Sequence, residues 1–449
     1  MTAKIYKSEW VLPITSPPIH QGAIAVDGEQ LVFVGRQNEL ASNRQFPNVE
    51  VKDFGRAAIL PGLINTHTHL ELTLMRGFLE DLPFRDWILK LTKTKYERLT
   101  IEDLQASALL GAAEALRAGI TCVADTGDSR APMDAMRQSG LRGIAYREVF
   151  GPDAAMALQA LADLKAKVAE MRDSESERVS VGVSPHAPYT VSAELFRHVV
   201  EFAAREVLDV AIHTAESSAE SDLLMSGTGD FAERLALRGI EWQSPRTSTI
   251  KYFAALGVLD VQPLLIHCVQ VDDEDIELLS RSRSRIAHCP KSNAKLGHGI
   301  APLAKFLNAG IRVGLGTDSV ASNNRLDLLN EANLCALVQR AAAKNFNEPT
   351  VEQMFRLMTI DGARALNLEN QIGSLEIGKQ ADVIAVDLSA THNAPLHDAM
   401  AAILFSATSS DVRMTMVAGR VLYADGEIQS IDESRVASQV NLALPKLID

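Results

Sequence analysis

The sequence predicts an α/β protein: a (β/α)₈ TIM barrel with a small β-sandwich domain that both ends of the chain build together. The chain has 449 residues, which is enough for a barrel of about 250 residues and a smaller partner domain. Its middle alternates apolar strand-like runs with amphipathic helical runs, as expected for strands that are joined by helices. Both ends are rich in short strand-like runs instead.

Residues 1–56 contain short strand-like runs that are separated by turns. Gly22–Asp27 and Leu31–Gly35 flank the dipeptide Asp27-Gly28, which is typical of a β-hairpin turn. Val49–Phe54 is a further candidate strand. We therefore assign residues 1–56 to the N-terminal part of the β-sandwich.

Residues 57–370 carry the alternation that predicts the barrel. The expected strands are Ala58–Asn65, Ile120–Asp125, Gly143–Val149, Val179–Val183, Val210–His213, Leu264–His267, Ser284–His288 and Arg312–Thr317. The expected helices include Ile101–Ala118, Ala155–Met171, Ser192–Glu206, Asp273–Arg281 and Asn324–Arg340. A doubly wound open sheet is the alternative. It is disfavoured because no Gly-x-Gly-x-x-Gly follows the first strand.

Residues 371–449 return to short strands and end in a tail. Ala381–Asp387, Val412–Val417 and Gly419–Ala424 are the expected strands of the C-terminal part of the sandwich. Within the barrel, the longest irregular stretch is Ser217–Thr249, with a helical piece at Phe231–Leu237. Long connections at the C-terminal face of a barrel often shape the active site.

Composition limits the partners and the compartment. The formal charge is −13 with no basic run, which argues against nucleic acid or an anionic membrane as a partner. No stretch approaches the roughly 20 apolar residues that cross a bilayer, and Met1–Trp10 lacks the apolar core of a signal peptide. Four scattered cysteines without a Cys-x-x-Cys pair indicate free thiols. We expect a cytoplasmic protein.

Histidine side chains and one aspartate collect at the ends of the predicted barrel strands. They are His67 and His69 after the first strand, His186 after the fourth, His213, His267 and His288 at the ends of the fifth, sixth and seventh, and Asp318 at the end of the eighth. The ends of parallel barrel strands open onto one face, so these groups converge in space. Neutral imidazoles together with a carboxylate suit a divalent metal ion.

His67, His69, His213 and Asp318 are the predicted metal ligands. Residues two apart on a strand face the same side, so His67 and His69 can chelate one ion. Asp318 has an alternative role as a helix N-cap. Two-metal barrels carry a bridging lysine at the end of the fourth strand, where this chain has Val183–His186 without lysine. One metal ion is expected. Zinc is the first choice, with iron or manganese as alternatives.

Glu216, His267 and Asp318 are the predicted catalytic residues. Glu216 lies three residues after His213, where a carboxyl group can reach over the metal and move protons between water and substrate. The alternative for Glu216 is a helix N-terminal acid favoured by the helix dipole. His267 is expected to bond the attacking water. The role of His288 is left open between support of the site and simple packing.

Six motifs along the chain are similar to those of a known family. They are PGLINTHTHLELTLMRG (Pro61–Gly77), SPHAPYTVS (Ser184–Ser192), HTAES (His213–Ser217), LIHCVQVDDEDI (Leu265–Ile276), HCPKSNAKLGHG (His288–Gly299) and GLGTDSVASNN (Gly314–Asn324). In this order they resemble the amidohydrolase superfamily, in its branch of adenosine-derivative deaminases and triazine hydrolases. The resemblance runs from about residue 22 to 425. Phe84–Trp87 and the long insert are most similar to aminofutalosine deaminase-like proteins, and methylthioadenosine/S-adenosylhomocysteine deaminases are the next most similar.

The resemblance implies the same metal ligands and makes Glu216 the proton shuttle, with His267 as a partner of the bound water. It also implies substrate contacts. His186 matches a substrate-contacting histidine, and Glu97 aligns, after one gap, with a glutamate that binds ribose hydroxyls. Trp87, Asn293 and Ser319 lie in matched segments and are further expected substrate contacts.

The expected function is therefore metal-dependent hydrolytic deamination of an adenine-type ring in a nucleoside derivative: aminodeoxyfutalosine, methylthioadenosine or S-adenosylhomocysteine. Homo-oligomers are common for such barrels, and we expect one here. The alternatives are a triazine hydrolase or chlorohydrolase with the same mononuclear site, and a deaminase of guanine or another nucleobase. A barrel that has lost catalysis is disfavoured because the expected metal ligands and the proton shuttle are all present: His67, His69, His213, Asp318 and Glu216. The cytidine-type zinc deaminases need Pro-Cys-x-x-Cys, which this chain lacks.

Overall fold

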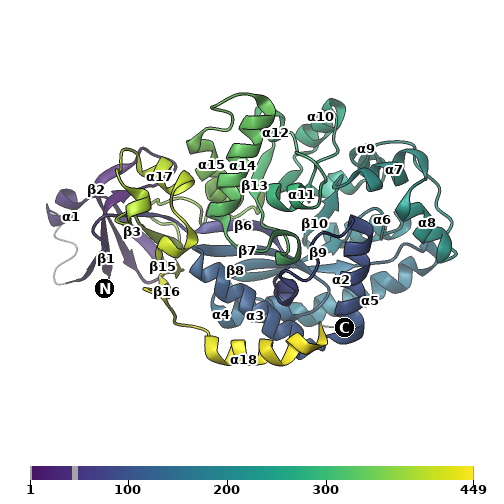
Figure 1. Ribbon diagram of the computed structural model, residues 1–449, viewed down its shortest axis with the longest axis horizontal. Helices are drawn as coiled ribbons and strands as arrows, with labels where there is room; N and C mark the ends of the chain where they lie inside the picture. The colour runs from purple at the N-terminus through teal and green to yellow at the C-terminus, as the bar shows by residue number, and fades with distance from the viewer. Residues whose placement is uncertain (1–2, 43–48, 448–449) are drawn as a thin grey trace.

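The structure, a computed structural model, describes residues 3–42 and 49–447 and combines an eight-stranded barrel with a nine-stranded sheet beside it (Figure 1). The barrel strands are β6 (Leu63–Thr68), β7 (Ile120–Gly127), β8 (Arg142–Val149), β9 (Val179–Pro185), β10 (Asp209–Thr214), β11 (Leu264–His267), β12 (Arg285–His288) and β13 (Arg312–Leu315). Neighbouring strands are parallel and follow the order of the chain. The predicted TIM barrel is confirmed.

The barrel closes next to the predicted metal ligands. A parallel bridge joins Thr68, the last residue of β6, to Asp318, just beyond β13. The backbone N–H of Asp318 donates to the carbonyl oxygen of His67 at 3.0 Å. Closure therefore brings together residues that lie 251 positions apart in the sequence.

Helices surround the barrel strands (Figure 1). They are α2 (Phe84–Arg98), α3 (Ile101–Arg117), α4 (Ala131–Ser139), α5 (Ala157–Arg172), α6 (Ala193–Glu206), α7 (Ser218–Ser226), α8 (Asp230–Leu237), α9 (Thr249–Ala255), α10 (Asp273–Ser282), α11 (Pro290–Lys295), α12 (Leu303–Asn308), α13 (Val320–Asn323), α14 (Leu328–Ala343), α15 (Val351–Met358) and α16 (Ile360–Ala365). None of the helices in the described part of the chain is long and apolar enough to cross a membrane. All four cysteines are free and buried.

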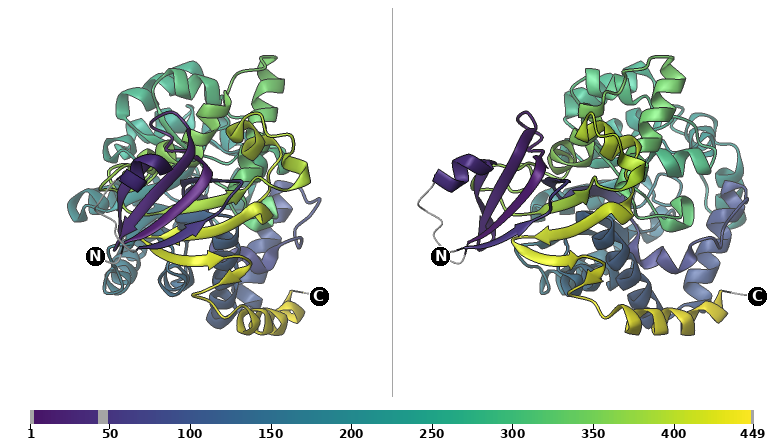
Figure 2. Two further views of the ribbon diagram at one scale, coloured as in Figure 1. Left: turned by 90° about the vertical axis from the view of Figure 1, so that its left-hand side faces the viewer. Right: turned by 60° about the vertical axis from the view of Figure 1, so that its left-hand side comes forward.

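Both ends of the chain supply strands to the second sheet, as predicted. These are β1 (Lys4–Val11), β2 (Ile19–Asp27), β3 (Gln30–Arg36), β4 (Glu50–Asp53), β5 (Ala57–Pro61), β14 (Val383–Asp387), β15 (Val412–Val417), β16 (Arg420–Ala424) and β17 (Glu427–Ile428). The helix α1 (Gln37–Ser42) packs beside β2 and β3, and α17 (Ala399–Phe405) packs against the barrel helices α14 and α15. The antiparallel pair β5–β14 joins the two ends, and Val11, Ile24 and Met414 share one buried core. Figure 2 shows the purple and yellow strands side by side.

The division into residues 1–56, 57–370 and 371–449 stays a proposal, and two elements refine it. β5 begins at residue 57 but pairs with β1 and β14 in the second sheet. The C-terminal helix α18 (Glu433–Ala443) follows that sheet in the chain and packs against the barrel helix α3 (Figure 1).

The expected strand Ala58–Asn65 is split in the structure at Gly62 into β5 and β6. Gly62 donates its backbone N–H to the carbonyl oxygen of Asp382 at 2.9 Å. A Cβ at this position would lie 2.1 Å from the Thr121 hydroxyl oxygen. The chain passes from the second sheet into the barrel at a point where no side chain fits, and only residues 63–68 line the barrel.

The expected helix Asn324–Arg340 begins later, at Leu328. Asn324 has a φ of 71° and ends the short helix α13 in the left-handed region. The Asp327 carboxylate then accepts the backbone N–H of Asn330 at 3.0 Å and caps α14. Asn324 therefore terminates one helix, and Asp327 starts the next by satisfying a free N–H group.

A buried ion pair connects the barrel to the second sheet. Arg142 on β8 donates from Nε to Asp382 beside β14 at 2.9 Å, and both side chains are at most 2% exposed. Arg142→Met leaves the Asp382 carboxylate buried and uncompensated, so we expect a loss of about 3–5 kcal/mol in the free energy of unfolding, measured by urea denaturation.

The control is Arg413→Met, because Arg413 pairs with Asp425 at 3.1 Å on the surface. That variant should lose less than about 1 kcal/mol. Equal losses for the two variants would contradict the structural role of the buried pair.

Candidate active site

The predicted metal ligands meet at the C-terminal mouth of the barrel. Nε2 of His67 lies 3.1 Å from Oδ1 of Asp318, and Nε2 of His69 lies 3.4 Å from the same oxygen. Candidate ligand atoms of His67, His69 and His213 lie within 4.8 Å of one another. Ligand atoms around one tetrahedral zinc ion, each about 2.0–2.1 Å from it, lie about 3.3–3.4 Å apart, which matches the two distances to Asp318.

Left-handed backbone conformations gather at the mouth of the barrel. Ala215, His267, Cys268 and Asp318 all have φ between 48° and 76°, although none is glycine. Such conformations cost on the order of 1–3 kcal/mol each and gather at functional sites. Left-handed residues thus lie at the end of β11 and just beyond the ends of β10 and β13.

Electrostatics at the site favours metal binding by neutral imidazoles. Burial lowers the pKa of His67 to about 4 and lowers the pKa of His213 well below its usual value. Burial also opposes the charge on Asp318, but the hydrogen bonds from His67 and His69 outweigh it and hold the pKa of this carboxyl well below its usual range. For His69 the pull of Asp318 exceeds the effect of burial and raises the pKa to about 9. A proton and a metal ion would compete for Nε2 of His69, the nitrogen that faces Asp318.

The donor set fits one divalent metal ion. Three imidazoles and a carboxylate converge, with Nε2 of both His67 and His69 facing Oδ1 of Asp318. His67, His267 and Asp318 form a second group within 4.8 Å, and Glu148, His186 and His213 form a third. Nδ1 of His213 is 3.1 Å from the carbonyl oxygen of His186 and would donate to it, which leaves only Nε2 for a metal. The group of His67, His69 and His213 and the group of Glu148, His186 and His213 therefore share one ligand nitrogen, so the two cannot each hold an ion at the same time.

Glu216 lies over this group of ligands, between two histidines. Its Oε1 is 3.5 Å from Nε2 of His267 and 3.4 Å from Nε2 of His298. Burial raises its pKa, but the two histidines outweigh burial and the net pKa is lowered. Glu216 is therefore a buried carboxylate beside the site. The nearby Glu220 accepts the backbone N–H groups of Ala215 and Glu216 at 2.8 and 3.2 Å and so holds this turn.

His298 was not predicted from the sequence, although the glycine-flanked motif that contains it was noted. Its ring packs edge-on against Phe84 with 4.4 Å between centroids, and it is 9% exposed. His288, whose role the sequence left open, is fully buried with no partner for either ring nitrogen among the described residues. Burial lowers the pKa of His288 to about 3, and it does not line the cavity described next.

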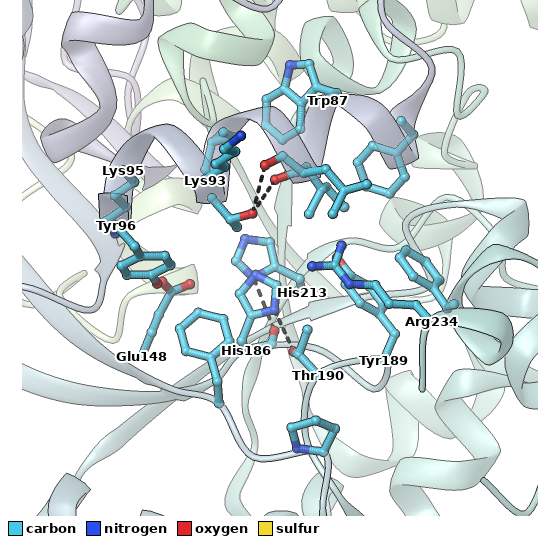
Figure 3. Close-up of a pocket in the computed structure, with 18 of the residues that line it drawn as sticks. Trp87, Lys93, Lys95, Tyr96, Glu148, His186, Tyr189, Thr190, His213 and Arg234 are labelled. Carbon is cyan, nitrogen blue, oxygen red and sulfur yellow. Dashed lines mark hydrogen bonds between the residues drawn. The ribbon is translucent and has the colours of Figure 1, made fainter. Parts of the chain in front are cut away.

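A cavity of about 910 Å³ opens over the candidate metal ligands (Figure 3). Among the expected substrate contacts, His186, Glu97, Trp87 and Ser319 line it. Nδ1 of His186 lies 2.8 Å from the Thr190 hydroxyl, so its Nε2 is available to the cavity. Asn293 does not line the cavity. Its Oδ1 lies 2.9 Å from Nδ1 of His267, which it orients from behind.

The helix α2 forms one wall of this cavity and was not predicted. It carries Trp87, Tyr96 and Glu97, together with Lys95, whose ammonium group contacts Glu71 and Asp128. Burial opposes the charge of Lys95, but the two carboxylates outweigh it and raise its pKa. The buried network anchors α2 against the barrel next to His69.

Comparison with known proteins identifies the family of the chain. A model described as the amidohydrolase family matches residues 58–422. The chain belongs to the amidohydrolase family. It is an enzyme, a hydrolase of carbon–nitrogen bonds other than peptide bonds in cyclic amidines.

This amidohydrolase is similar to several known proteins. A 5-methylthioadenosine/S-adenosylhomocysteine deaminase of Moorella thermoacetica is 33% identical over 440 residues, which cover 97% of each chain. The crystal structure of a zinc-bound adenosine deaminase from Xanthomonas campestris superposes with a TM-score of 0.86 at 26% identity and covers 99% of this chain and 98% of that one. An aminofutalosine deaminase of Helicobacter pylori, in complex with methylthio-coformycin, shares the fold with a TM-score of 0.79 at 21% identity, over 93% and 99% of the two chains.

Proposed function

We propose that this amidohydrolase is a metal-dependent hydrolytic deaminase that replaces the amino group of an adenine-type ring in a nucleoside derivative and releases ammonia. The observation that carries the proposal is the position of Glu216. Its carboxylate lies beside His267, next to the candidate ligands, and forms no part of the ligand set. A carboxylate so placed can move a proton between water and a ring nitrogen.

The residues divide the reaction among them. His67, His69, His213 and Asp318 would hold the metal ion, which when bound supplies Lewis acidity and lowers the pKa of water toward about 7. Asp318 and His267 orient the attacking water and accept its hydrogen bonds. Glu216 accepts a proton from water and delivers it to the ring nitrogen beside the carbon that bears the amino group. The oxygen of the water adds to this carbon as hydroxyl, and the remaining proton of that hydroxyl passes to the amino group. The bond between the ring carbon and the amino nitrogen then breaks, ammonia leaves, and the added oxygen becomes the carbonyl oxygen of the product.

The cavity supports a substrate larger than a free base. Its volume of about 910 Å³ lies near the upper end of small-molecule sites, which span about 300–1,000 Å³. Aromatic side chains of Trp87, Tyr189 and Phe231 line it and offer stacking surfaces for a ring. We propose aminodeoxyfutalosine, methylthioadenosine or S-adenosylhomocysteine as the substrate, in keeping with the names of the similar proteins. A homo-oligomeric state and a cytoplasmic location stay predictions from the sequence.

An ammonia-release screen tests the proposed function. The zinc-loaded enzyme is incubated with adenosine, methylthioadenosine, S-adenosylhomocysteine, aminodeoxyfutalosine, guanine and an amino-triazine. We expect release from at least one adenine nucleoside and none from the triazine. Release from guanine or the triazine alone would transfer the function to one of the alternative classes.

Metal removal should abolish activity reversibly. A chelated enzyme is expected to lose turnover and to regain it with zinc, and its unfolding temperature should rise on addition of zinc. An ion that binds only the native state stabilises it by about 2.7 kcal/mol when the free ion is at a hundred times its Kd. Magnesium, which prefers oxygen ligands, is the control and should restore neither property. Full activity after complete chelation would contradict metal dependence.

A further inference from the structure

The insert after β10 places an arginine in the wall of the active-site cavity. α8 (Asp230–Leu237) belongs to this insert, and its Phe231, Arg234 and Leu235 line the cavity together with Arg238 at its end. Phe231 stacks on Tyr189 with 4.0 Å between ring centroids and an interplanar angle of 1°. This stacking fixes the helix against the barrel. Figure 3 shows the guanidinium group of Arg234 directed into the cavity.

The charge of Arg234 is not neutralised within the described part of the chain. Arg234 and Arg238 form no hydrogen bond or ion pair there, whereas the neighbouring Arg85 pairs with Asp230 at 3.3 Å. Arg234 is only partly exposed, and burial together with the nearby charges of Arg238 and Arg85 lowers its pKa. Three guanidinium groups thus gather beside a cavity with largely apolar walls, in a chain whose formal charge is −13.

A cation that is partly removed from water without a partner is costly. An anionic oxygen group on a ligand would compensate it, because a guanidinium matches carboxylate or phosphate with two parallel hydrogen bonds. The apolar surroundings strengthen this attraction. The neutral ring that reacts at the metal site has no such group, so the anion must belong to another part of the substrate.

We propose that Arg234, supported by Arg238, binds an anionic carboxylate or phosphate group on the substrate and selects adenine derivatives that carry one over neutral ones. This inference rests on the proposed function, since it specifies the substrate of the same site. Among the proposed substrates, it favours those with a carboxylate over methylthioadenosine, which is neutral.

Matched pairs of substrates test the proposal. The pairs are S-adenosylhomocysteine with its carboxamide, and adenosine 5′-carboxylic acid with its carboxamide. Adenosine 5′-monophosphate, compared with adenosine, distinguishes phosphate from carboxylate. For the zinc-loaded enzyme we expect kcat/KM to be about ten- to hundredfold higher for the anionic member of at least one pair. Arg234→Gln should remove this difference and leave kcat/KM for the neutral member within about twofold.

Two further variants sharpen the test. Arg234→Lys keeps the charge but loses the paired hydrogen bonds, and should retain part of the preference. Arg205→Gln alters an exposed arginine of α6 outside the cavity and should change nothing. Equal kcat/KM for acid and amide in every pair would overturn the proposal. An equal loss for both members in Arg234→Gln would overturn it as well, because it would mean that the guanidinium stacks on the ring.

Failure of the proposed function gives a different result. If no adenine nucleoside releases ammonia, the deaminase assignment fails. The binding proposal is then tested separately, by calorimetric titration of the acid and the amide of each pair into the native enzyme and into Arg234→Gln. Tighter binding of the acid that disappears in Arg234→Gln supports the anion site. Equal binding of acid and amide overturns it.

Discussion

Glu216→Gln is expected to retain its metal and to lose about a thousandfold in kcat, within the range of about 10²–10⁴-fold for a positioned acid–base group. The amide preserves the shape of the side chain but cannot accept and deliver the proton. The ligands are unaffected because Glu216 lies 3.5 Å from His267 and outside the ligand set. Ammonia release measures kcat, and elemental analysis measures the bound metal.

Glu201→Gln is the matched control for this variant, since Glu201 is an exposed glutamate of α6. It should leave both kcat and metal content unchanged. Unchanged turnover in Glu216→Gln would remove Glu216 from proton transfer. Loss of metal together with turnover would instead make it part of the metal site.

Asp318→Ala is expected to lose both metal affinity and activity. The substitution removes a carboxylate that lies 3.1 Å from His67 and 3.4 Å from His69. It also leaves the hydroxyls of Ser292 and Ser322, which donate to Oδ2 at 2.5 and 2.8 Å, without their acceptor. Loss of a group that only orients a ligand costs about 10–100-fold in metal affinity, and loss of a ligand should cost more.

Asp318→Asn separates charge from packing in this site. It keeps an acceptor for the serine hydroxyls but removes the negative charge, so metal affinity should fall while the unfolding temperature of the metal-free protein stays close to that of the native chain. Equilibrium dialysis with zinc measures the affinity. Full zinc-dependent activity in either Asp318 variant would show that the site is assigned wrongly.

The sequence predicted the barrel because each strand is a short apolar run that ends in a recognisable polar residue. His213, His267 and His288 end or nearly end their strands, as expected. The strand β1 and the helix α2 were not predicted. β1 alternates charged and apolar residues but begins at the extreme N-terminus, and α2 carries many polar residues because it covers a cavity and a buried charge network rather than an apolar core.

The candidate site was predictable where neighbours in sequence are neighbours in space or where strand ends force convergence. His67 and His69 share one strand end, and Asp318 meets them through barrel closure. His298 and Arg234 reach the site from loops and helices after the strands, and no periodicity indicates where such segments fold back. Asn293 lies in a matched motif, but only the structure relates it to His267 instead of the cavity.

We propose that one metal ion and Glu216 together replace an amino group on an adenine-type ring by oxygen from water. The most direct measurement is mass spectrometry of the product formed by the zinc-loaded enzyme in ¹⁸O-labelled water, with ammonia counted in the same sample. We expect one ¹⁸O atom in each product molecule in place of the amino group, and one molecule of ammonia released for each molecule of product. Release of a different substituent, or a product without ¹⁸O, would contradict it.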